Sequence, residues 1–162
     1  MKLNELMEKY GDYEVKEGFM DLLEKPKPKS VYDLKSGDRY FFLTASGIIQ
    51  GAFWHDDISD HNRLSIGNIS LTEEAAEFAR ERLEVIAELK KYAKEFSEEE
   101  WRNGNTAKYL FYRSFPGNRI YITSTYSAHY PCLYFESMEK AKQAFNAVGE
   151  ERIKKYYFGV KE

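Results

Sequence analysis

The sequence predicts an α+β fold built from two β-β-β-α-like units, with antiparallel sheets and helices packed on one side. Two hairpin patterns support this prediction, because each joins two apolar or aromatic runs through a short turn that contains glycine. In both cases a polar loop, a short strand and an amphipathic helix follow in the same order. The two helices begin at Thr72 and Ser137, which are good N-cap residues, so the units recur 65 positions apart.

A short helical arm and a linker are expected before these units. Apolar side chains recur at helical spacing within residues 3–10 and again within residues 19–23. Residues 25–30 (KPKPKS) place two prolines among three lysines, which disfavours both a helix and a central strand. We therefore divide the chain into a helical N-terminal arm with its Lys/Pro linker, residues 1–30, and a single α+β domain, residues 31–162.

The first half of the domain, residues 31–96, contains the clearest helix pattern of the sequence. Its predicted elements are a strand at residues 39–44, a turn at 46–47, a strand at 48–54, a polar loop at 55–62, a short strand at 64–69 and a helix at 72–95. Acidic residues follow the N-cap of this helix and lysines lie near its end, as the helix dipole favours. Its apolar stripe, which is expected to pack on a sheet, includes Phe78, Leu83, Ile86 and Leu89.

The second half, residues 104–162, follows a short capped turn. Residues 97–100 (SEEE) have the spacing of a capping box, which predicts one further helical turn. The elements predicted after it are a strand at residues 108–114, a turn at 116–118, a strand at 119–125, a loop at 126–131, a short strand at 132–135 and a helix that begins at Ser137. In the strand at 119–125, isoleucines are expected on one face and Tyr121 and Thr123 on the other.

The charge balance is mildly acidic, with 24 Lys and Arg against 27 Asp and Glu and a formal net charge of −3. A general DNA-binding domain is usually strongly basic, so this composition does not predict one. No run of about 20 apolar residues is present, so no membrane-spanning helix is expected. The N-terminus lacks the apolar core of a secretory signal, and the single cysteine, Cys132, cannot form an internal disulfide. We therefore expect the chain in the cytoplasm, without membrane contact.

The usual sequence motifs of enzymes are missing. The chain has no phosphate-binding loop of the GxxxxGKS/T type, no GxGxxG, no GxSxG and no HExxH. We therefore expect no enzymatic activity, no catalytic residues, no cofactor and no metal. One alternative stays open, because residues 55–61 hold two histidines and three aspartates. Such side chains can bind a divalent ion, which would make the protein a metal-dependent enzyme centred on His55 and His61.

The first candidate binding loop follows the first hairpin. Its predicted contact residues are Trp54, Asp57, Asp60 and Arg63. The planar guanidinium group of Arg63 can pair with a carboxylate or a phosphate through two parallel hydrogen bonds. Arg63 is therefore the expected anchor for an acidic or phosphate partner.

The second candidate binding loop follows the second hairpin and contains Tyr126, His129 and Tyr130. Tyrosines in a loop provide rigid contact area and a hydrogen-bonding tip, which suits recognition. The two loops occupy equivalent positions of the two units. We therefore expect them to lie at related ends of the fold and to form one contact surface.

Several short stretches within about the first 95 residues form a recognisable pattern. They are residues 10–15 (YGDYEV), 25–34 (KPKPKSVYDL), 37–40 (GDRY), 54–57 (WHDD), Asp60, 63–68 (RLSIGN), 72–75 (TEEA) and 82–83 (RL). On these stretches the chain resembles a family of small uncharacterised proteins encoded by phages and prophages of Gram-positive bacteria. The resemblance implies a cytosolic accessory protein of a mobile element. Proteins of that kind often neutralise bacterial defence, for example by binding a CRISPR effector or by trapping a signalling nucleotide.

We therefore expect a non-enzymatic phage or prophage accessory protein that acts by binding, in its sharpest form an inhibitor of bacterial anti-phage defence. The expected partner is a host protein or a nucleotide ligand rather than DNA. A second hypothesis is a nucleic-acid-binding accessory protein that uses Lys25, Lys27 and Lys29 together with aromatic residues of the strands. The metal-dependent enzyme is the third hypothesis, and the oligomeric state is left open.

Overall fold

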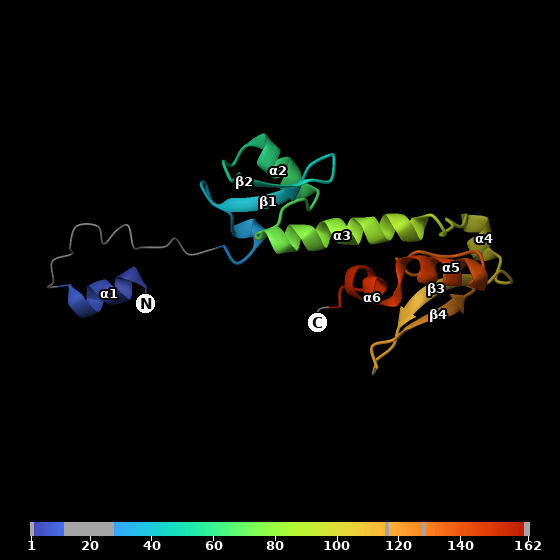
Figure 1. The fold of residues 1–162 in the computed structure, drawn as a ribbon. Helices are drawn as coiled ribbons and strands as arrows, with labels where there is room; N and C mark the ends of the chain where they lie inside the picture. Colours follow the sequence, from blue (N-terminus) through green and yellow to red (C-terminus); the bar gives the residue numbers. More distant parts are fainter. Residues whose placement is uncertain (1, 12–27, 116, 128, 161–162) are drawn as a thin grey trace.

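The chain folds as a mixed α+β protein, as the sequence predicts. The computed structural model describes residues 2–11, 28–115, 117–127 and 129–160. In chain order the elements are α1 (Leu3–Tyr10), η2 (Val31–Asp33), β1 (Arg39–Leu43), β2 (Ile49–Phe53), α2 (Ile58–Ser65), α3 (Glu73–Lys90), α4 (Glu98–Arg102), β3 (Lys108–Arg113), β4 (Ile120–Thr125), α5 (Met138–Val148), α6 (Glu150–Arg152) and η3 (Ile153–Tyr157). Element η2 is a 3₁₀ turn and η3 is a π-helix. The strands form two separate antiparallel pairs, β1–β2 and β3–β4 (Figure 1).

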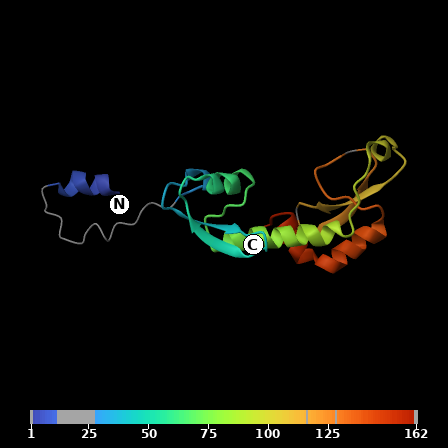
Figure 2. The same ribbon diagram turned by 90° about the horizontal axis from the view of Figure 1, so that it is seen from above.

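The long helix α3 connects two structural units (Figure 1, Figure 2). The first unit consists of η2, β1, β2 and α2 and packs on the N-terminal part of α3. The second unit consists of α4, β3, β4, α5, α6 and η3 and packs along the helix as far back as Phe78, whose ring centroid lies 5.3 Å from that of Tyr156 in η3. Each unit has its own cluster of buried apolar side chains. The first cluster contains Tyr40, Trp54 and Ile69. The second is larger and contains Val85, Leu89, Phe111, Ile120, Phe135, Ala141, Ala144, Val148 and Ile153.

Two sets of hydrogen bonds, one from backbone and one from a side chain, occupy the outer edge of β1. Phe41 and Ser70 exchange backbone hydrogen bonds, at 2.8 Å in each direction. Beside this bridge, the side-chain amide of Asn68 donates to the carbonyl of Leu43 and accepts from its N–H, both at 2.8 Å. The predicted strand at residues 64–69 is therefore wrong. In its place, the backbone of Ser70 and the side chain of Asn68 form hydrogen bonds with β1.

Helix α2 occupies most of the segment for which the sequence predicts a polar loop, residues 55–62. Asp57 is its N-cap and accepts hydrogen bonds from the backbone N–H groups of Ser59 and Asp60, at 2.8 and 2.9 Å. This cap satisfies donors that the start of a helix leaves unpaired. The loop prediction is wrong because these polar residues form the exposed face of a helix, whose Asp60 is buried and whose Leu64 packs against the first cluster.

Strands β3 and β4 form the predicted second hairpin. On β4, Ile120 is buried and Tyr121 is exposed, which confirms the predicted faces of this strand. The strand predicted at residues 132–135 reduces to a single bridge, in which Tyr109 and Phe135 exchange backbone hydrogen bonds. This bridge is the counterpart of the one made by β1, and a capped helix follows each bridge.

Helix α3 begins at the predicted N-cap, where the Thr72 hydroxyl accepts a hydrogen bond from a first-turn N–H at 3.2 Å. It ends at Lys90 rather than at residue 95. Its buried residues include Val85, whereas Leu83, a member of the predicted stripe, is 60% exposed. The prediction assumes that one sheet covers the whole helix. Instead α3 contacts β1 and β2 of the first unit as well as α5 and η3 of the second, so more than one face of the helix is covered.

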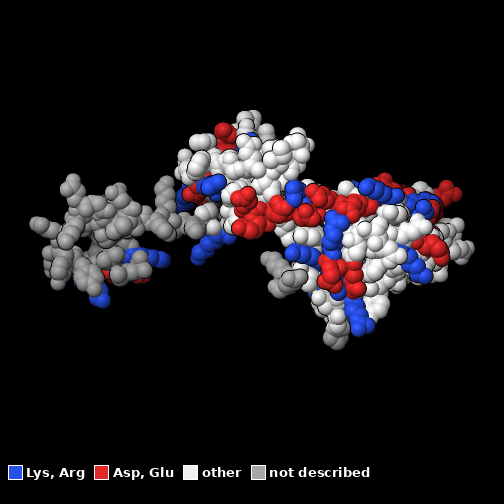
Figure 3. All heavy atoms as spheres, viewed as in Figure 1, with Lys and Arg blue, Asp and Glu red and all other residues white. Residues whose placement is uncertain are grey.

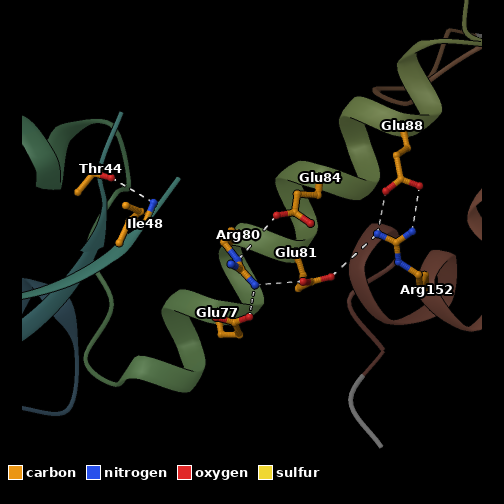
Figure 4. Close-up of polar contacts among 8 residues, drawn as sticks. All are labelled: Thr44, Ile48, Glu77, Arg80, Glu81, Glu84, Glu88 and Arg152. Carbon is orange, nitrogen blue, oxygen red and sulfur yellow. Dashed lines mark hydrogen bonds and ion pairs between the residues drawn. The ribbon is translucent and has the colours of Figure 1, made fainter. Parts of the chain in front are cut away.

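Charged side chains cover the exposed side of α3 (Figure 3). Within the helix, Arg80 forms ion pairs with Glu77, Glu81 and Glu84 (Figure 4). Farther along, the guanidinium group of Arg152 donates to both carboxylate oxygens of Glu88, at 2.9 Å each. These hydrogen bonds hold the pKa of Glu88 below its usual value. The bidentate pair ties α6 to α3.

Helix α1 agrees with the first helix predicted for the N-terminal arm. The second predicted arm helix and most of the Lys/Pro linker lie outside the described residues. Among the helices that are described, none combines the length and the apolar character needed to cross a membrane.

Candidate functional site

The predicted site residues lie in two different units. The first unit contains Trp54, Asp57, Asp60 and Arg63, and the second contains Tyr126, His129 and Tyr130. Helix α3 connects these units, and within the described part of the chain no hydrogen bond or ring contact joins the two groups (Figure 1). Each group therefore has its own surroundings.

Asp60 is the centre of a buried polar network in the first unit. It is 2% exposed, and its carboxylate accepts hydrogen bonds from the Tyr40 hydroxyl at 2.6 Å and from the His55 N–H at 2.7 Å. Arg63 donates to the same hydroxyl oxygen at 2.6 Å and lies 3.7 Å from the Asp60 carboxylate. Burial by itself raises the pKa of Asp60, but the hydrogen bonds outweigh this effect and hold the pKa below its usual value. The network fixes α2 on β1.

The other predicted residues of this group also have partners inside the unit. Trp54 is buried and packs edge-on against Tyr40, with ring centroids 6.2 Å apart. The guanidinium group of Arg63 lies over the ring of Phe42, 4.0 Å from its centroid. Asp57 caps α2. These contacts favour a structural role for the group over contact with a ligand.

The histidines and aspartates of residues 55–61 do not converge on one point. His61 Nε2 lies 3.0 Å from a carboxylate oxygen of Asp56, and its ring packs edge-on against Trp54 at 5.5 Å. Asp60 belongs to the buried network. Among the described residues, no group of three or more His, Cys, Asp or Glu side chains is placed to hold a metal ion. This geometry gives the metal-dependent hypothesis no support.

A pocket in the second unit is walled by four aromatic rings, which we call the aromatic pocket. Phe96 and Trp101 come from the segment around α4, and His129 and Tyr134 come from the segment after β4. His129 stacks on Trp101 with ring centroids 4.6 Å apart, and Tyr134 meets Trp101 edge-on at 4.9 Å. The pocket has a volume of about 560 Å³. That volume lies in the range of sites for small molecules.

A fully buried lysine lies against the aromatic pocket. The Lys108 ammonium is 4.7 Å from the ring centroid of Trp101 and 5.5 Å from that of Phe96. It donates hydrogen bonds to the backbone carbonyls of Thr106 and Tyr126, at 3.0 and 3.2 Å. No carboxylate of the described residues forms an ion pair with it, so carbonyl oxygens and ring faces stabilise its charge. The ammonium thereby holds Trp101 over β3.

Basic side chains line the pocket beside the rings. Lys94 Nζ lies 4.9 Å from the ring centroid of Phe96 and forms an ion pair with Glu100 at 2.8 Å. Glu100 also accepts a hydrogen bond from the N–H of Ser97 at 2.9 Å, which confirms the predicted capping box of α4. Lys90 lines the same pocket. Ring faces beside ammonium groups favour a ligand that is both planar and anionic.

Two titratable groups of the aromatic pocket, Tyr134 and Cys132, keep their protons at neutral pH. Burial raises the pKa of Tyr134 to about 12, and its hydroxyl donates to the carbonyl of Tyr130 at 2.9 Å. Burial also raises the pKa of the Cys132 thiol, although a hydrogen bond with Tyr134 acts in the opposite direction. A protonated thiol is a poor nucleophile, because the thiolate is the reactive form.

One member of the second predicted loop belongs to the aromatic pocket. His129 stacks on Trp101, whereas Tyr126 and Tyr130 are 50% and 53% exposed. Trp101 and Lys108 are not among the site residues predicted from the sequence. A signal was present at Trp101, since the capping box at residues 97–100 places this residue on a short helix outside any apolar stripe. Nothing in the sequence distinguishes Lys108 from the other basic residues of the strands.

The aromatic pocket thus brings together ring faces and two lysines, Lys90 of α3 and Lys94 of the segment after it. The buried ammonium of Lys108 lies close to the rings of Trp101 and Phe96 but does not line the pocket. All of these groups belong to the second unit or to the end of α3 and the segment after it. In comparisons with known proteins, no family model, no curated protein and no solved structure matches this chain.

Proposed function

We propose that this protein is a non-enzymatic binding protein and that the aromatic pocket holds its ligand or partner. The observation that carries the proposal is an accessible pocket with four ring walls beside the buried ammonium of Lys108. Aromatic side chains provide rigid contact area at a low cost in conformational entropy, and they dominate the energy of many binding sites.

The protonation of neighbouring groups supports binding rather than catalysis. Burial raises the pKa values of Tyr134 and Cys132, so neither is a ready base or nucleophile at neutral pH. The ammonium of Lys108 is engaged by two backbone carbonyls. A general base or acid works best when its pKa lies near the working pH, a condition that Tyr134 does not meet.

For the biological role we propose a phage or prophage accessory protein that inhibits bacterial anti-phage defence. The resemblance within about the first 95 residues supports this role. The chemistry of the aromatic pocket supports a nucleotide ligand, whose base can stack on a ring and whose phosphate can pair with Lys90 or Lys94. A host protein that inserts an aromatic side chain next to an acidic one would offer the same chemistry.

Ligand binding can be tested with a panel of mononucleotides and cyclic dinucleotides in isothermal titration. We expect one class to bind, and we expect Trp101→Ala to weaken binding by about 1–3 kcal/mol. His129→Ala is a second variant, since this residue is exposed. Phe53→Ala is the matched control, because it removes an exposed ring from the first unit and is expected to leave binding unchanged. Salt-dependent retention on duplex DNA would instead favour the nucleic-acid hypothesis.

The defence role can be tested by infection. The chain is expressed in bacterial strains that each carry one defence system, either a CRISPR nuclease or a nucleotide-signalling system, and phage plating efficiency is measured. We expect the wild type and Phe53→Ala to restore plating in at least one strain and Trp101→Ala to fail. If no strain regains sensitivity, the inhibitor role is wrong. If Trp101→Ala and His129→Ala act like the wild type, the aromatic pocket is not the contact site.

A further inference from the structure

The outer edge of β4 carries backbone groups that no other described strand uses. In the β3–β4 hairpin, the N–H of Ser114 donates to the carbonyl of Arg119 at 3.0 Å, which marks this pair as hydrogen-bonded. Hydrogen-bonded and non-hydrogen-bonded pairs alternate along an antiparallel ladder. It follows from the register that Ile120, Ile122 and Ser124 direct their N–H and C=O groups away from β3.

Part of this edge is already occupied. The N–H of Ile120 donates to a carboxylate oxygen of Glu150 at 3.4 Å. Among the described residues, no backbone group outside the hairpin pairs with Ile122 or Ser124. The outer sides of β1 and β3 each carry one of the bridges described above, at Phe41 and at Tyr109. Strand β2 also lies at an edge, but Gly51 at its centre offers no side chain to pack against a neighbouring strand.

The side chains of β4 are suited to pairing with another strand, and none of them is a charged residue or a proline that would hinder it. The strand reads IYITST, which is rich in β-branched and aromatic residues. Natural edge strands are commonly protected by a lysine, a proline or a bulge, and β4 has no charge, no proline and an uninterrupted register with β3. Next to the edge, Tyr112 and Tyr121 lie opposite each other on the exposed face, 52% and 49% accessible.

We propose that β4 pairs antiparallel with β4 of a second copy of this chain, with Thr123 opposite Thr123 of that copy. The register follows from the two unoccupied residues. Ile122 and Ser124 flank Thr123, so in this register Ile122 of each copy lies opposite Ser124 of the other. Residues opposite each other in a hydrogen-bonded pair exchange both of their N–H···O=C bonds. The outward groups of Ile122 and Ser124 are then all satisfied.

A second copy fits this edge better than a foreign strand. The outward groups of Ile122 and Ser124 are symmetric about Thr123, as an interface with two-fold symmetry requires. The strand is uncharged, so self-pairing sets no like charges against each other. The product is a four-stranded sheet in the order β3-β4-β4-β3, with both copies of α5 on one face. This interface is separate from the aromatic pocket, and it does not depend on the proposed function.

The mass of the full-length chain in solution tests the proposal. Analytical ultracentrifugation over a wide concentration range is expected to give twice the 19.1 kDa mass of one chain. Thr123→Lys and Thr123→Glu each place two like charges opposite each other in the proposed register, and each is expected to give the monomer mass. An equimolar mixture of these two variants places Lys against Glu and is expected to restore the dimer.

The controls separate pairing from folding and from net charge. Thr123 is exposed, so both variants are expected to keep the melting temperature of the wild type. Gln50→Lys adds the same charge to an exposed position on β2 and is expected to leave the dimer intact. A monomeric wild type overturns the proposal, including the case in which β4 then binds an extended peptide of another protein. So does a dimeric Thr123→Lys, a monomeric Gln50→Lys, or a mixture that stays monomeric.

Discussion

The carboxylate of Asp60 is held by three different parts of the first unit. Tyr40 reaches it from β1, the His55 N–H from the segment after β2, and Arg63 from the same helix, α2. An ionised carboxylate accepts hydrogen bonds and donates none, so these donors satisfy it while it is buried. Because the apolar cluster of this unit is small, the polar network contributes a large part of what fixes α2.

Removing this carboxylate is expected to destabilise the protein. Asp60→Ala leaves the hydroxyl of Tyr40 and the half-buried Arg63 without their acceptor, so the free energy of unfolding should fall by about 2–3 kcal/mol in urea titrations. Asp56→Asn is the matched control. Its contact with His61 is exposed, so the loss should be about 0.5 kcal/mol or less. Equal losses in the two variants would contradict the network role of Asp60.

The same carboxylate predicts a pH dependence of stability. Its pKa is lower in the folded chain than the ordinary value of 3.8, so ionised Asp60 stabilises the fold above that pH. The contribution is lost as pH falls below 3.8 toward the folded-state pKa. Asp60→Asn lacks this titration. The gap in unfolding free energy between wild type and Asp60→Asn should therefore narrow from about pH 5 to about pH 2. A constant gap over this range would assign the dependence to another group.

Among the elements, α3 is the one shared by both units, and its buried positions change along its length. Ala76 is buried near the first unit, and Val85 and Leu89 are buried in the second cluster. Leu83 lies on the same helix and is mostly exposed. A periodic stripe in the sequence identifies a helix, but it cannot show that two separate bodies cover different faces of it.

This difference between neighbouring positions of α3 can be measured. Val85→Asp places a carboxylate among apolar side chains without a partner, so it should lower the unfolding free energy by about 4 kcal/mol or more. Leu83→Asp changes an exposed residue and should alter it by about 0.5 kcal/mol or less. Thermal and urea unfolding of both variants provides the test. The reverse order of effects would mean that the stripe through Leu83 faces the core.

Local hydrogen-bonding chemistry explains which elements could be predicted from the sequence. The caps at Thr72, Ser97 and Ser137 depend on residues within one helical turn, and all three are confirmed. The sequence alone could not show that the first unit lacks a third strand. The Asn68 amide takes the place of that strand, and it does so through a contact with the distant β1. The aromatic pocket likewise depends on two distant segments that meet at Trp101, and no local pattern reports such a meeting.

At the scale of the whole molecule, the two apolar clusters remain separate and α3 is the connection between them (Figure 1). Each hairpin pairs within its own unit, and both units contact the helix. The charged side of α3 stays exposed between them (Figure 3). This arrangement favours two cooperative units that open separately.

Hydrogen exchange can test this independence. Tyr40→Ala removes a buried ring from the first cluster and a hydrogen-bond donor from its polar network, so amide protection should fall in β1 and β2 while β3 and β4 stay protected. Phe111→Ala, in the second cluster, should give the opposite pattern. If either variant lowers protection equally in all four strands, the chain unfolds as one body.

The position of α3 between the two hairpins also bears on the order in which a growing chain assembles. The first unit and its helix are complete once residue 90 has left the ribosome, before β3 has emerged from it. Domains synthesised first generally fold first. At that moment Val85 and Leu89 have no cover, because their partners come from later in the chain. The nascent helix therefore presents a preformed apolar surface. The β3–β4 hairpin and α5 pack against this surface when they emerge.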